Sequence, residues 1–114
     1  MLLISPAKLA YILLRARELD SDVPHGQHYR ELADFITELN VDEQASLTAL
    51  VWIGRETFEA DELEEAIQTA REEATAPSAG YLLGMPQLAE YIEDGMEALG
   101  LSIEDAEGEV LRPT

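Results

Sequence analysis

Two histidines and two aspartates in one short stretch are the residues best suited to binding a metal ion. His25 and His28 are three positions apart, and Asp20 and Asp22 precede them in a segment that also contains Pro24. Imidazole nitrogens and carboxylate oxygens are common protein ligands of divalent metals. These four side chains are therefore the metal candidates, and divalent-metal or small-ligand binding is one alternative function. The interpretation that we favour is a polar loop with exposed histidines, so we predict no metal site.

The same stretch matches only part of a calcium-binding loop. Asp20, Asp22 and Glu31 occupy positions 1, 3 and 12 of that pattern. Pro24 and His25 occupy the fifth and sixth positions, where a ligand and a turn-forming glycine are required. We therefore expect no calcium site here and predict no cofactor for the chain.

No pattern of catalytic residues is found elsewhere. The chain has no cysteine, and its 24 acidic residues are too many for spacing alone to select a catalytic pair. The acidic run that comprises Glu90, Glu93, Asp94 and Glu97 is typical of a solvated helix surface. No G-x-S-x-G, phosphate-binding glycine loop or H-E-x-x-H motif is present. We therefore predict no catalytic residues and expect a protein that is not an enzyme.

Arg55 and Trp52 are candidates for a binding role. Arg55 is the only basic residue between Glu31 and Ala70, and a guanidinium can hold a carboxylate or phosphate through two parallel hydrogen bonds. The alternative is that Arg55 pairs with a helix end or a nearby acid. Trp52 is interpreted as a core residue or an interface anchor before a platform for a cofactor.

The acidic charge is concentrated in the second half of the chain. Residues 1–55 hold eight acids and five bases, a net of −3, and residues 56–114 hold sixteen acids and two bases, a net of −14, which gives −17 in total. Such a surface repels nucleic-acid phosphates and anionic lipid, so we expect neither as a partner. The acidity is typical of a solubilising surface or of adaptation to a salty cytoplasm. An alternative function is an acidic regulator or nucleic-acid mimic that binds a basic protein.

No stretch of the sequence predicts a membrane span or a secretory signal. The longest run without charge, residues 74–89, has 16 residues and contains two prolines and two glycines. A membrane-spanning helix needs about 20 apolar residues. The first residues lack a basic flank before their apolar run. Since the absence of cysteine also fits a reducing compartment, we expect a cytoplasmic protein.

Apolar residues recur at three- and four-residue steps along most of the chain, which predicts helices. The expected helices are residues 5–19, 29–39, 42–54 with Asp42 as N-cap, 60–73 and 86–99, with a short helical turn at 79–83. Gly54 is expected to end the third helix in the left-handed conformation. Residues 1–103 are expected to form a single domain, followed by an acidic tail at 104–114. A two-stranded pairing of residues 1–4 with 110–111 is the alternative for the chain ends.

The third helix differs from the others because it lacks a polar face. Residues 47–53 are apolar at nearly every position. Such a helix needs neighbours on several sides, so we place it at the centre of the fold or against a second subunit. The predicted class is all-α, a single compact domain of about five helices in orthogonal or bundle-like packing around this central apolar helix.

Several motifs together resemble a known family. They are Leu39-Asn40-x-Asp42-Glu43-Gln44, Ala49-Leu50-x-Trp52-Ile53-Gly54-Arg55 and Tyr81-Leu82-Leu83-Gly84-x-Pro86-x-Leu88, followed by Tyr91-Ile92-Glu93-Asp94-Gly95. The chain resembles, from roughly Ser5 to Asp105, a family of small bacterial proteins catalogued only as a domain of unknown function. That resemblance implies no activity, cofactor or catalytic residue.

The function that these observations favour is association with other protein chains. We expect a non-enzymatic homodimer that uses the third helix and the segment Tyr81–Leu88, because these leave excess apolar surface on a small domain. The residues predicted at this interface are Trp52, Arg55, Tyr81, Leu82 and Met85.

Overall fold

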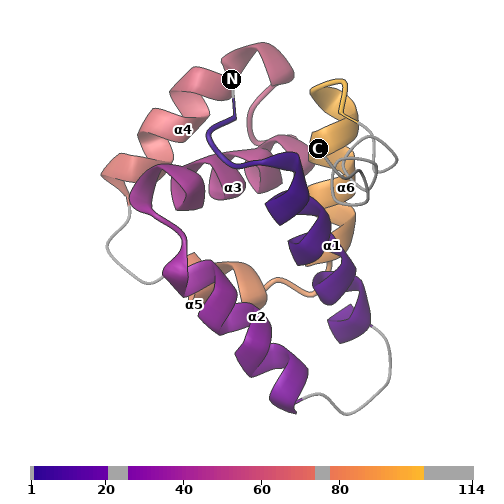
Figure 1. Cartoon of the computed structure of the whole chain (residues 1–114). Helices are drawn as coiled ribbons and strands as arrows, with labels where there is room; N and C mark the ends of the chain where they lie inside the picture. Colours follow the sequence, from indigo (N-terminus) through magenta and orange to yellow (C-terminus); the bar gives the residue numbers. More distant parts are fainter. Residues whose placement is uncertain (1, 21–25, 74–77, 102–114) are drawn as a thin grey trace, which may run out of the picture.

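The chain is helical throughout the part that the structure describes. The computed structural model describes residues 2–20, 26–73 and 78–101 (Figure 1). Its elements are α1 (Pro6–Asp20), α2 (Gly26–Glu38), α3 (Val41–Gly54), the 3-10 helix η1 (Ala60–Glu62), α4 (Leu63–Glu72), α5 (Ser78–Leu83) and α6 (Leu88–Ala98). No strand occurs within these residues, which confirms the all-α class. The α-helices exceed the expected five because the turn predicted at 79–83 is the short helix α5.

The expectations about the C-terminal end lie outside the described residues. These are the acidic tail at 104–114 and the alternative pairing that involves residues 110–111. Within the described ranges, no helix combines the length and the apolar character that crossing a bilayer requires.

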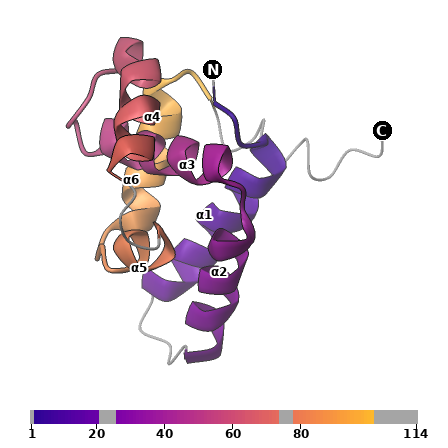
Figure 2. The ribbon, with the colours of Figure 1, turned by 90° about the vertical axis from the view of Figure 1, so that its left-hand side faces the viewer.

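Helix α3 lies inside the fold. It packs on α6 and α4, and Figures 1 and 2 show α4 above it with α2 and α5 below it. Leu47, Leu50 and Val51 are fully buried. A helix that is apolar all round needs neighbours on several sides, and other helices of the same chain provide them. Most apolar residues of α3 are therefore covered within one chain, apart from the exposed Val41 and the half-buried Trp52.

Helices α3 and α6 cross at a pair of glycines. A methyl group at Gly54 would overlap the carbonyl oxygen of Tyr91, and a methyl group at Gly95 would overlap the carbonyl oxygen of Leu50. The two backbones approach this closely because neither glycine carries a β-carbon. The crossing therefore places Tyr91 beside the C-terminal end of α3.

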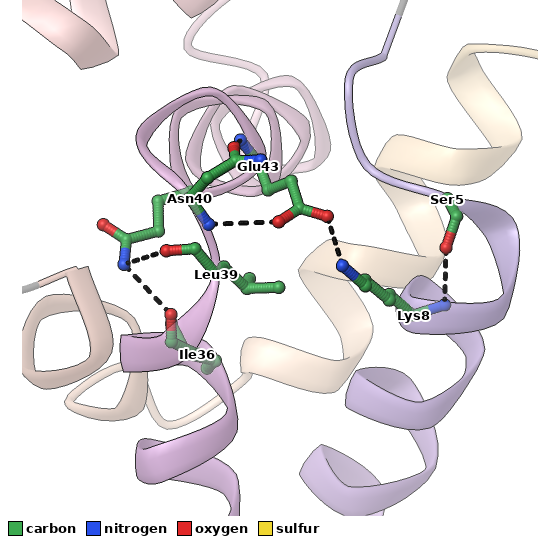
Figure 3. A network of polar contacts seen from close by, with 7 residues as sticks. Ser5, Lys8, Ile36, Leu39, Asn40 and Glu43 are labelled. Atoms are coloured by element: carbon green, nitrogen blue, oxygen red, sulfur yellow. Dashed lines mark hydrogen bonds and ion pairs between the residues drawn. The ribbon is translucent and has the colours of Figure 1, made fainter.

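Helix α3 begins with a capping box centred on Asn40. The side-chain oxygen of Asn40 accepts a hydrogen bond from the Glu43 backbone N–H at 2.7 Å, and Glu43 Oε1 accepts one from the Asn40 backbone N–H at 3.0 Å (Figure 3). This exchange satisfies two backbone N–H groups at the helix start. The prediction of Asp42 as N-cap is therefore wrong. Asp42 instead accepts a hydrogen bond from Arg71 of α4 at 2.6 Å.

The side chain of Gln44 joins the end of α2 to α3. Its Nε2 donates to the carbonyl oxygens of Ile36 at 3.0 Å and Leu39 at 3.1 Å. Carbonyl groups at the end of a helix have no partner within that helix. The motif at residues 39–44 therefore builds the corner between α2 and α3.

Helix α3 ends differently from the prediction. Gly54 is its last helical residue, and Arg55 follows in a right-handed conformation with its backbone N–H on the Val51 carbonyl at 2.9 Å. The residue in the left-handed region is Glu56, with φ of 66°. Gly54 is thus required by the contact with α6 and not by its own backbone angle. Glu56 adopts a conformation that residues with a β-carbon seldom take.

Helices α4 and α6 bury the stripes that their periodicity predicts. The buried residues are Leu63, Ala66, Ile67 and Ala70 on α4, and Leu88, Ile92 and Met96 on α6. Helix α6 begins at Leu88, two residues after the predicted start at Pro86. Gly100, with φ of 78°, follows the end of α6 as expected.

Candidate functional site

The residues predicted as metal ligands are not described in the detail that a site requires. Asp22 and His25 lie outside the described residues. Asp20 ends α1 and His28 lies in α2, but their side chains are not among those that the structure describes. The absence of a metal site therefore stays a prediction, and metal binding by these residues stays the alternative.

An acidic group does gather at the start of η1. Carboxylate oxygens of Glu59, Asp61 and Glu62 lie within 4.8 Å of one another. Glu62 Oε1 accepts a hydrogen bond from the Glu59 backbone N–H at 2.8 Å, so this group forms the start of the 3-10 helix. Its geometry is explained by the local fold, and we assign it no ligand.

Three of the residues predicted at an interface meet at the C-terminal end of α3. Trp52 Nε1 donates to the Tyr81 hydroxyl at 3.0 Å, and Arg55 Nη1 donates to the same hydroxyl at 3.4 Å. The Arg55 guanidinium also lies 5.8 Å from the centre of the Tyr91 ring. Trp52 stacks on Phe58, with ring centres 5.7 Å apart. We call Trp52, Arg55, Phe58, Tyr81 and Tyr91 the aromatic–arginine cluster.

Separate segments of the chain hold the cluster together. Trp52 lies in the last turn of α3, Tyr81 lies on α5 and Tyr91 lies in the first turn of α6. The glycine crossing fixes α6 against α3. Leu82 is fully buried in the main core and fixes α5. The cluster therefore depends on tertiary packing and not on one continuous motif.

The aromatic–arginine cluster lies on the surface of the fold. Arg55 is exposed, Tyr81 is 46% exposed, and Trp52, Phe58 and Tyr91 are half-buried. A guanidinium near a ring face is attracted by the negative charge of that face. Trp and Tyr combine a large apolar area with a hydrogen-bonding group. This combination is suited to binding another molecule.

Of the other two predicted interface residues, Leu82 lies in the main core and Met85 lies at its edge. Leu82 is fully buried, so it has no surface to offer to a partner. Met85 is half-buried and packs against the same core. Consecutive helical residues point to different sides, so Tyr81 is exposed while Leu82 is covered. The candidate surface therefore contains Tyr81 without Leu82.

Sequence reasoning misses Phe58 and Tyr91 as members of the cluster. Tyr91 stands four residues before Gly95, as Leu50 stands four residues before Gly54. This repeated spacing on two apolar helices is the signal that indicates a close crossing, and it brings Tyr91 to the end of α3. Phe58 follows α3 in a segment without helical periodicity, and no signal marks it.

Arg55 differs electrostatically from four other basic residues. Ion pairs join Lys8 to Glu43, Arg15 to Glu18 and Glu31, Arg17 to Glu93, and Arg71 to Asp42. Arg55 has no carboxylate partner among the residues that the structure describes, and its neighbours are the Tyr81 hydroxyl and the Tyr91 ring. Within the described residues, Arg55 is thus an exposed positive charge that lies beside aromatic groups and pairs with no carboxylate.

An ion pair that the sequence does not predict holds α1 against α3. Lys8 Nζ donates to Glu43 Oε2 at 2.5 Å (Figure 3), and the Glu43 side chain is only 12% exposed. The Lys8 ammonium and then the Asn40 backbone N–H lower the pKa of Glu43, because both stabilise its charged form. The spacing of Asn40 and Glu43 is a readable capping signal. Lys8 stands 35 residues away and gives no signal, and the pair serves the fold.

An apolar groove of about 370 Å³ lies beside the N-terminal segment. It is lined by Leu2, Ile4, Pro6, Leu9, Leu63, Leu99 and Leu101. These side chains carry no charge and no hydrogen-bonding group. The groove therefore offers area for apolar contact without a feature that selects a ligand.

Comparison with protein-family models identifies a family for the chain. The family model described as a protein of unknown function (DUF3775) matches residues 29–101, which is more than half of the chain. The chain belongs to the DUF3775 family. This confirms the resemblance to a family of unknown function that the sequence motifs indicate. Neither the curated proteins nor the solved structures include a match to the chain.

The DUF3775 segment contains the whole aromatic–arginine cluster, because residues 52–91 fall within the matched range 29–101. Lys8 of the ion pair lies before that range, as do Leu2, Ile4, Pro6 and Leu9 of the groove. The cluster is thus built entirely from the family segment, and it is our candidate functional site. Its chemistry consists of hydrogen-bond donors and aromatic faces, which suits binding.

Proposed function

We propose that this DUF3775 protein associates with a second copy of itself through the aromatic–arginine cluster. The observation that supports this proposal is the exposed Arg55, held against Tyr81 and Tyr91 with no carboxylate partner in the described part of the chain. Energetically important interface residues are enriched in Trp, Tyr and Arg. The cluster combines these three residue types on one surface.

The reason for expecting association is therefore different from the one that the sequence indicates. Most apolar residues of α3 are buried by other helices of the same chain, so the length of the helix offers little area for a dimer. Apart from Val41 at the start of the helix, what stays accessible is the C-terminal end of α3, where Trp52 is half-buried and Tyr81 is exposed. We therefore place the proposed interface at the C-terminal end of α3 and not along the whole helix.

A second copy is the partner that we favour because it supplies carboxylates. The chain carries 24 acids, and a guanidinium forms strong charge-assisted hydrogen bonds with a carboxylate across an interface. In a two-fold symmetric dimer the same surface of each copy faces the other. One cluster per chain is therefore enough to build the interface.

Sedimentation equilibrium tests this proposal. The wild-type chain is expected to be dimeric at high micromolar concentration. Arg55→Glu is expected to raise the dissociation constant about tenfold or more, because it removes a charge-assisted contact. Arg30→Glu is the matched control, since it makes the same charge change at an exposed position of α2, and it is expected to have little effect. A strict monomer in low and high salt, or equal effects of the two variants, would contradict the proposal.

A second candidate function uses the acidic surface of η1 and α4. The exposed carboxylates there are Asp61, Glu64, Glu65, Glu72 and Glu73, while the one basic residue of α4, Arg71, pairs with Asp42. Such a surface attracts a basic protein and repels nucleic acid and anionic lipid, so the chain would act as an acidic regulator or nucleic-acid mimic.

Binding to an immobilised basic protein at low salt tests this second function. Retention is expected to end at about 0.5 M salt, where the screening length is about 4 Å. Replacing Glu64 and Glu65 with Gln is expected to abolish retention. Replacing Glu90 and Glu97 with Gln removes the same charge from α6 and is expected to preserve it. Equal losses in the two variants would show that net charge alone is responsible.

A further inference from the structure

The Tyr81 hydroxyl already accepts two hydrogen bonds. Its oxygen receives Trp52 Nε1–H at 3.0 Å and Arg55 Nη1–H at 3.4 Å. A phenolic hydroxyl is also a donor. With two donors directed at the oxygen, its own proton is left for an acceptor, and no residue in the described part of the chain accepts it.

The Arg55 guanidinium adds further donors at the same place. It has five N–H groups, of which one makes a long hydrogen bond to Tyr81 at 3.4 Å. Arg55 and Tyr81 therefore present N–H and O–H donors side by side, and no acceptor accompanies them within the described ranges. Donors grouped in this way, one of them charged, form strong hydrogen bonds with an oxyanion.

We infer that Arg55 and Tyr81 bind the carboxylate of Glu56 from a second copy of the chain, an inference that rests on the proposed dimer. In that arrangement the guanidinium of one copy donates to the carboxylate of the other, and the Tyr81 hydroxyl donates its free proton to the same group. The Tyr91 and Trp52 rings flank the contact.

The charge of the chain favours a carboxylate as the bound group. Residues 56–114 carry a net charge of −14, so each additional negative charge on a ligand meets repulsion. A carboxylate carries one charge, and its two oxygens match two parallel N–H groups of a guanidinium. A phosphate or a polyanion makes the same contacts but is repelled more strongly by the negative charge of the chain.

Glu56 is the carboxylate that the local structure offers. It follows Arg55 directly, is exposed, and has no ion pair among the described residues. In a two-fold interface, if one residue contacts a second, the second contacts the first in return. Adjacent Arg55 and Glu56 near the axis therefore form two reciprocal pairs. The left-handed φ of 66° at Glu56 belongs to the turn that ends α3, in which the Thr57 backbone N–H donates to the Trp52 carbonyl oxygen at 2.9 Å.

Charge reversal tests the reciprocal pairing by sedimentation equilibrium. Arg55→Glu and Glu56→Arg are each expected to raise the dimer dissociation constant about tenfold or more. The double variant places an acid opposite a base again, as does an equimolar mixture of the two single variants. Both are expected to associate more tightly than either single variant, since the two charges act as a coupled pair, and to stay weaker than the wild type, because a Tyr81 hydroxyl that faces the Glu56→Arg substitution has lost its carboxylate acceptor. Far-UV circular dichroism confirms that each variant is folded.

Tyr81→Phe tests the second donor. It removes the hydroxyl and is expected to weaken the dimer about tenfold, because a hydrogen bond to a charged group is lost. Tyr29→Phe is the matched control, since Tyr29 is 44% exposed against 46% for Tyr81. The indole N–H resonance of Trp52, the one Trp in the chain, is expected to shift on dimerisation in the wild type and in Tyr29→Phe.

The outcomes separate this inference from the proposed function. A wild-type dimer that is weakened by Arg55→Glu but indifferent to Glu56→Arg, or a double variant that associates no more tightly than the single variants, overturns the pairing and leaves the interface in place. A wild-type chain that stays monomeric overturns both.

Discussion

Glu56 has a backbone conformation that favours glycine, with φ of 66°. A residue with a β-carbon pays about 1–2 kcal/mol for this conformation, and glycine adopts it without that strain. Glu56→Gly is therefore expected to raise the free energy of unfolding by about 0.5–1 kcal/mol, after the greater flexibility of glycine in the unfolded chain is subtracted. Urea unfolding in the Arg55→Glu background, at a protein concentration well below its dimer dissociation constant, measures this gain.

The neighbouring position provides the control for Glu56→Gly. Thr57 is exposed and does not have a positive φ, so Thr57→Gly is expected to destabilise the chain. A destabilising Glu56→Gly would show that the left-handed turn is not strained. With Arg55 intact, the same Glu56→Gly variant is expected to be more stable as a monomer and weaker as a dimer, a separation that a purely structural role for Glu56 does not produce.

Glu43 makes the stability of the fold depend on pH. Its pKa is lowered in the folded chain by Lys8 and by the Asn40 backbone N–H. A carboxyl whose folded pKa is depressed stabilises the fold above its unfolded pKa, and this contribution is lost as pH falls through the folded pKa. Glu43→Gln is expected to cost about 1–2 kcal/mol at pH 7, because a charged hydrogen bond is lost. The difference from wild type is expected to shrink below about pH 4.3.

Urea unfolding at pH 7 and at a pH below about 4.3 measures the difference in stability between Glu43→Gln and the wild type. Glu38→Gln changes the net charge equally at an exposed position at the end of α2, and it is expected to leave stability nearly unchanged at each pH. A Glu43→Gln deficit that persists at low pH would point to lost packing, and the absence of a deficit at pH 7 would contradict a stabilising ion pair.

At the scale of elements, the crossing of α3 and α6 connects the core to the candidate site. A methyl group at Gly95 would overlap the Leu50 carbonyl oxygen, so Gly95→Ala is expected to force the helices apart and cost about 1–3 kcal/mol or more. Since Tyr91 lies on α6, the same displacement moves it away from Arg55. Thermal unfolding and sedimentation equilibrium are expected to show losses of both stability and association.

Gly80 on α5 is the matched control for the crossing. A β-carbon there meets no atom within 4 Å. Because Gly is a poor helix former, Gly80→Ala is expected to stabilise α5 by about 0.5–1 kcal/mol. Opposite effects of the same substitution at the two glycines are thus expected. A mild Gly95→Ala would show that the helices adjust without cost.

The helices of this protein can be predicted because their signals are local. The stripe Leu63, Ala66, Ile67 and Ala70 is sufficient to predict α4 and its buried face. The ends of α3 are less predictable because several residues compete for each role. Asn40 and Asp42 are both good N-caps, and the choice depends on which one Glu43 can pair with. Gly54 resembles a helix stop, although its position is required by α6.

The candidate site is less predictable than the helices because it is assembled by tertiary contacts. Residue type and position are sufficient to select Trp52, Arg55 and Tyr81 as interface candidates. Their hydrogen bonds through the Tyr81 hydroxyl depend on how α5 packs, and no local sequence pattern predicts that packing. Leu82 shows the limit of the same reasoning. Leu82 is apolar, as an interface residue often is, but its position on α5 points its side chain toward the core.

For the whole molecule, the net charge of −17 opposes the association that we propose for the cluster. The described structure spans 36 × 35 × 24 Å. At about 0.01 M salt the screening length is about 30 Å, so nearly every carboxylate of one copy repels the other copy. At about 0.15 M salt the screening length is about 8 Å, and only charges close to the interface interact. In the proposed dimer, local attraction between Arg55 and a carboxylate is then expected to outweigh the distant repulsion.

The dimer is therefore expected to tighten as salt rises from about 0.01 M to about 0.15 M, the reverse of what binding to a basic protein would show. Sedimentation equilibrium over this range measures the dissociation constant. The apolar contacts of Trp52 and Phe58 are not weakened by screening, so they continue to stabilise the interface while long-range repulsion falls. Arg55→Glu adds a like charge at the contact itself and is expected to stay weaker than wild type at every salt concentration. A wild-type dimer that loosens steadily over the same range would mean that its interface is held by opposite charges across a large area, which a single cluster around Arg55 does not provide.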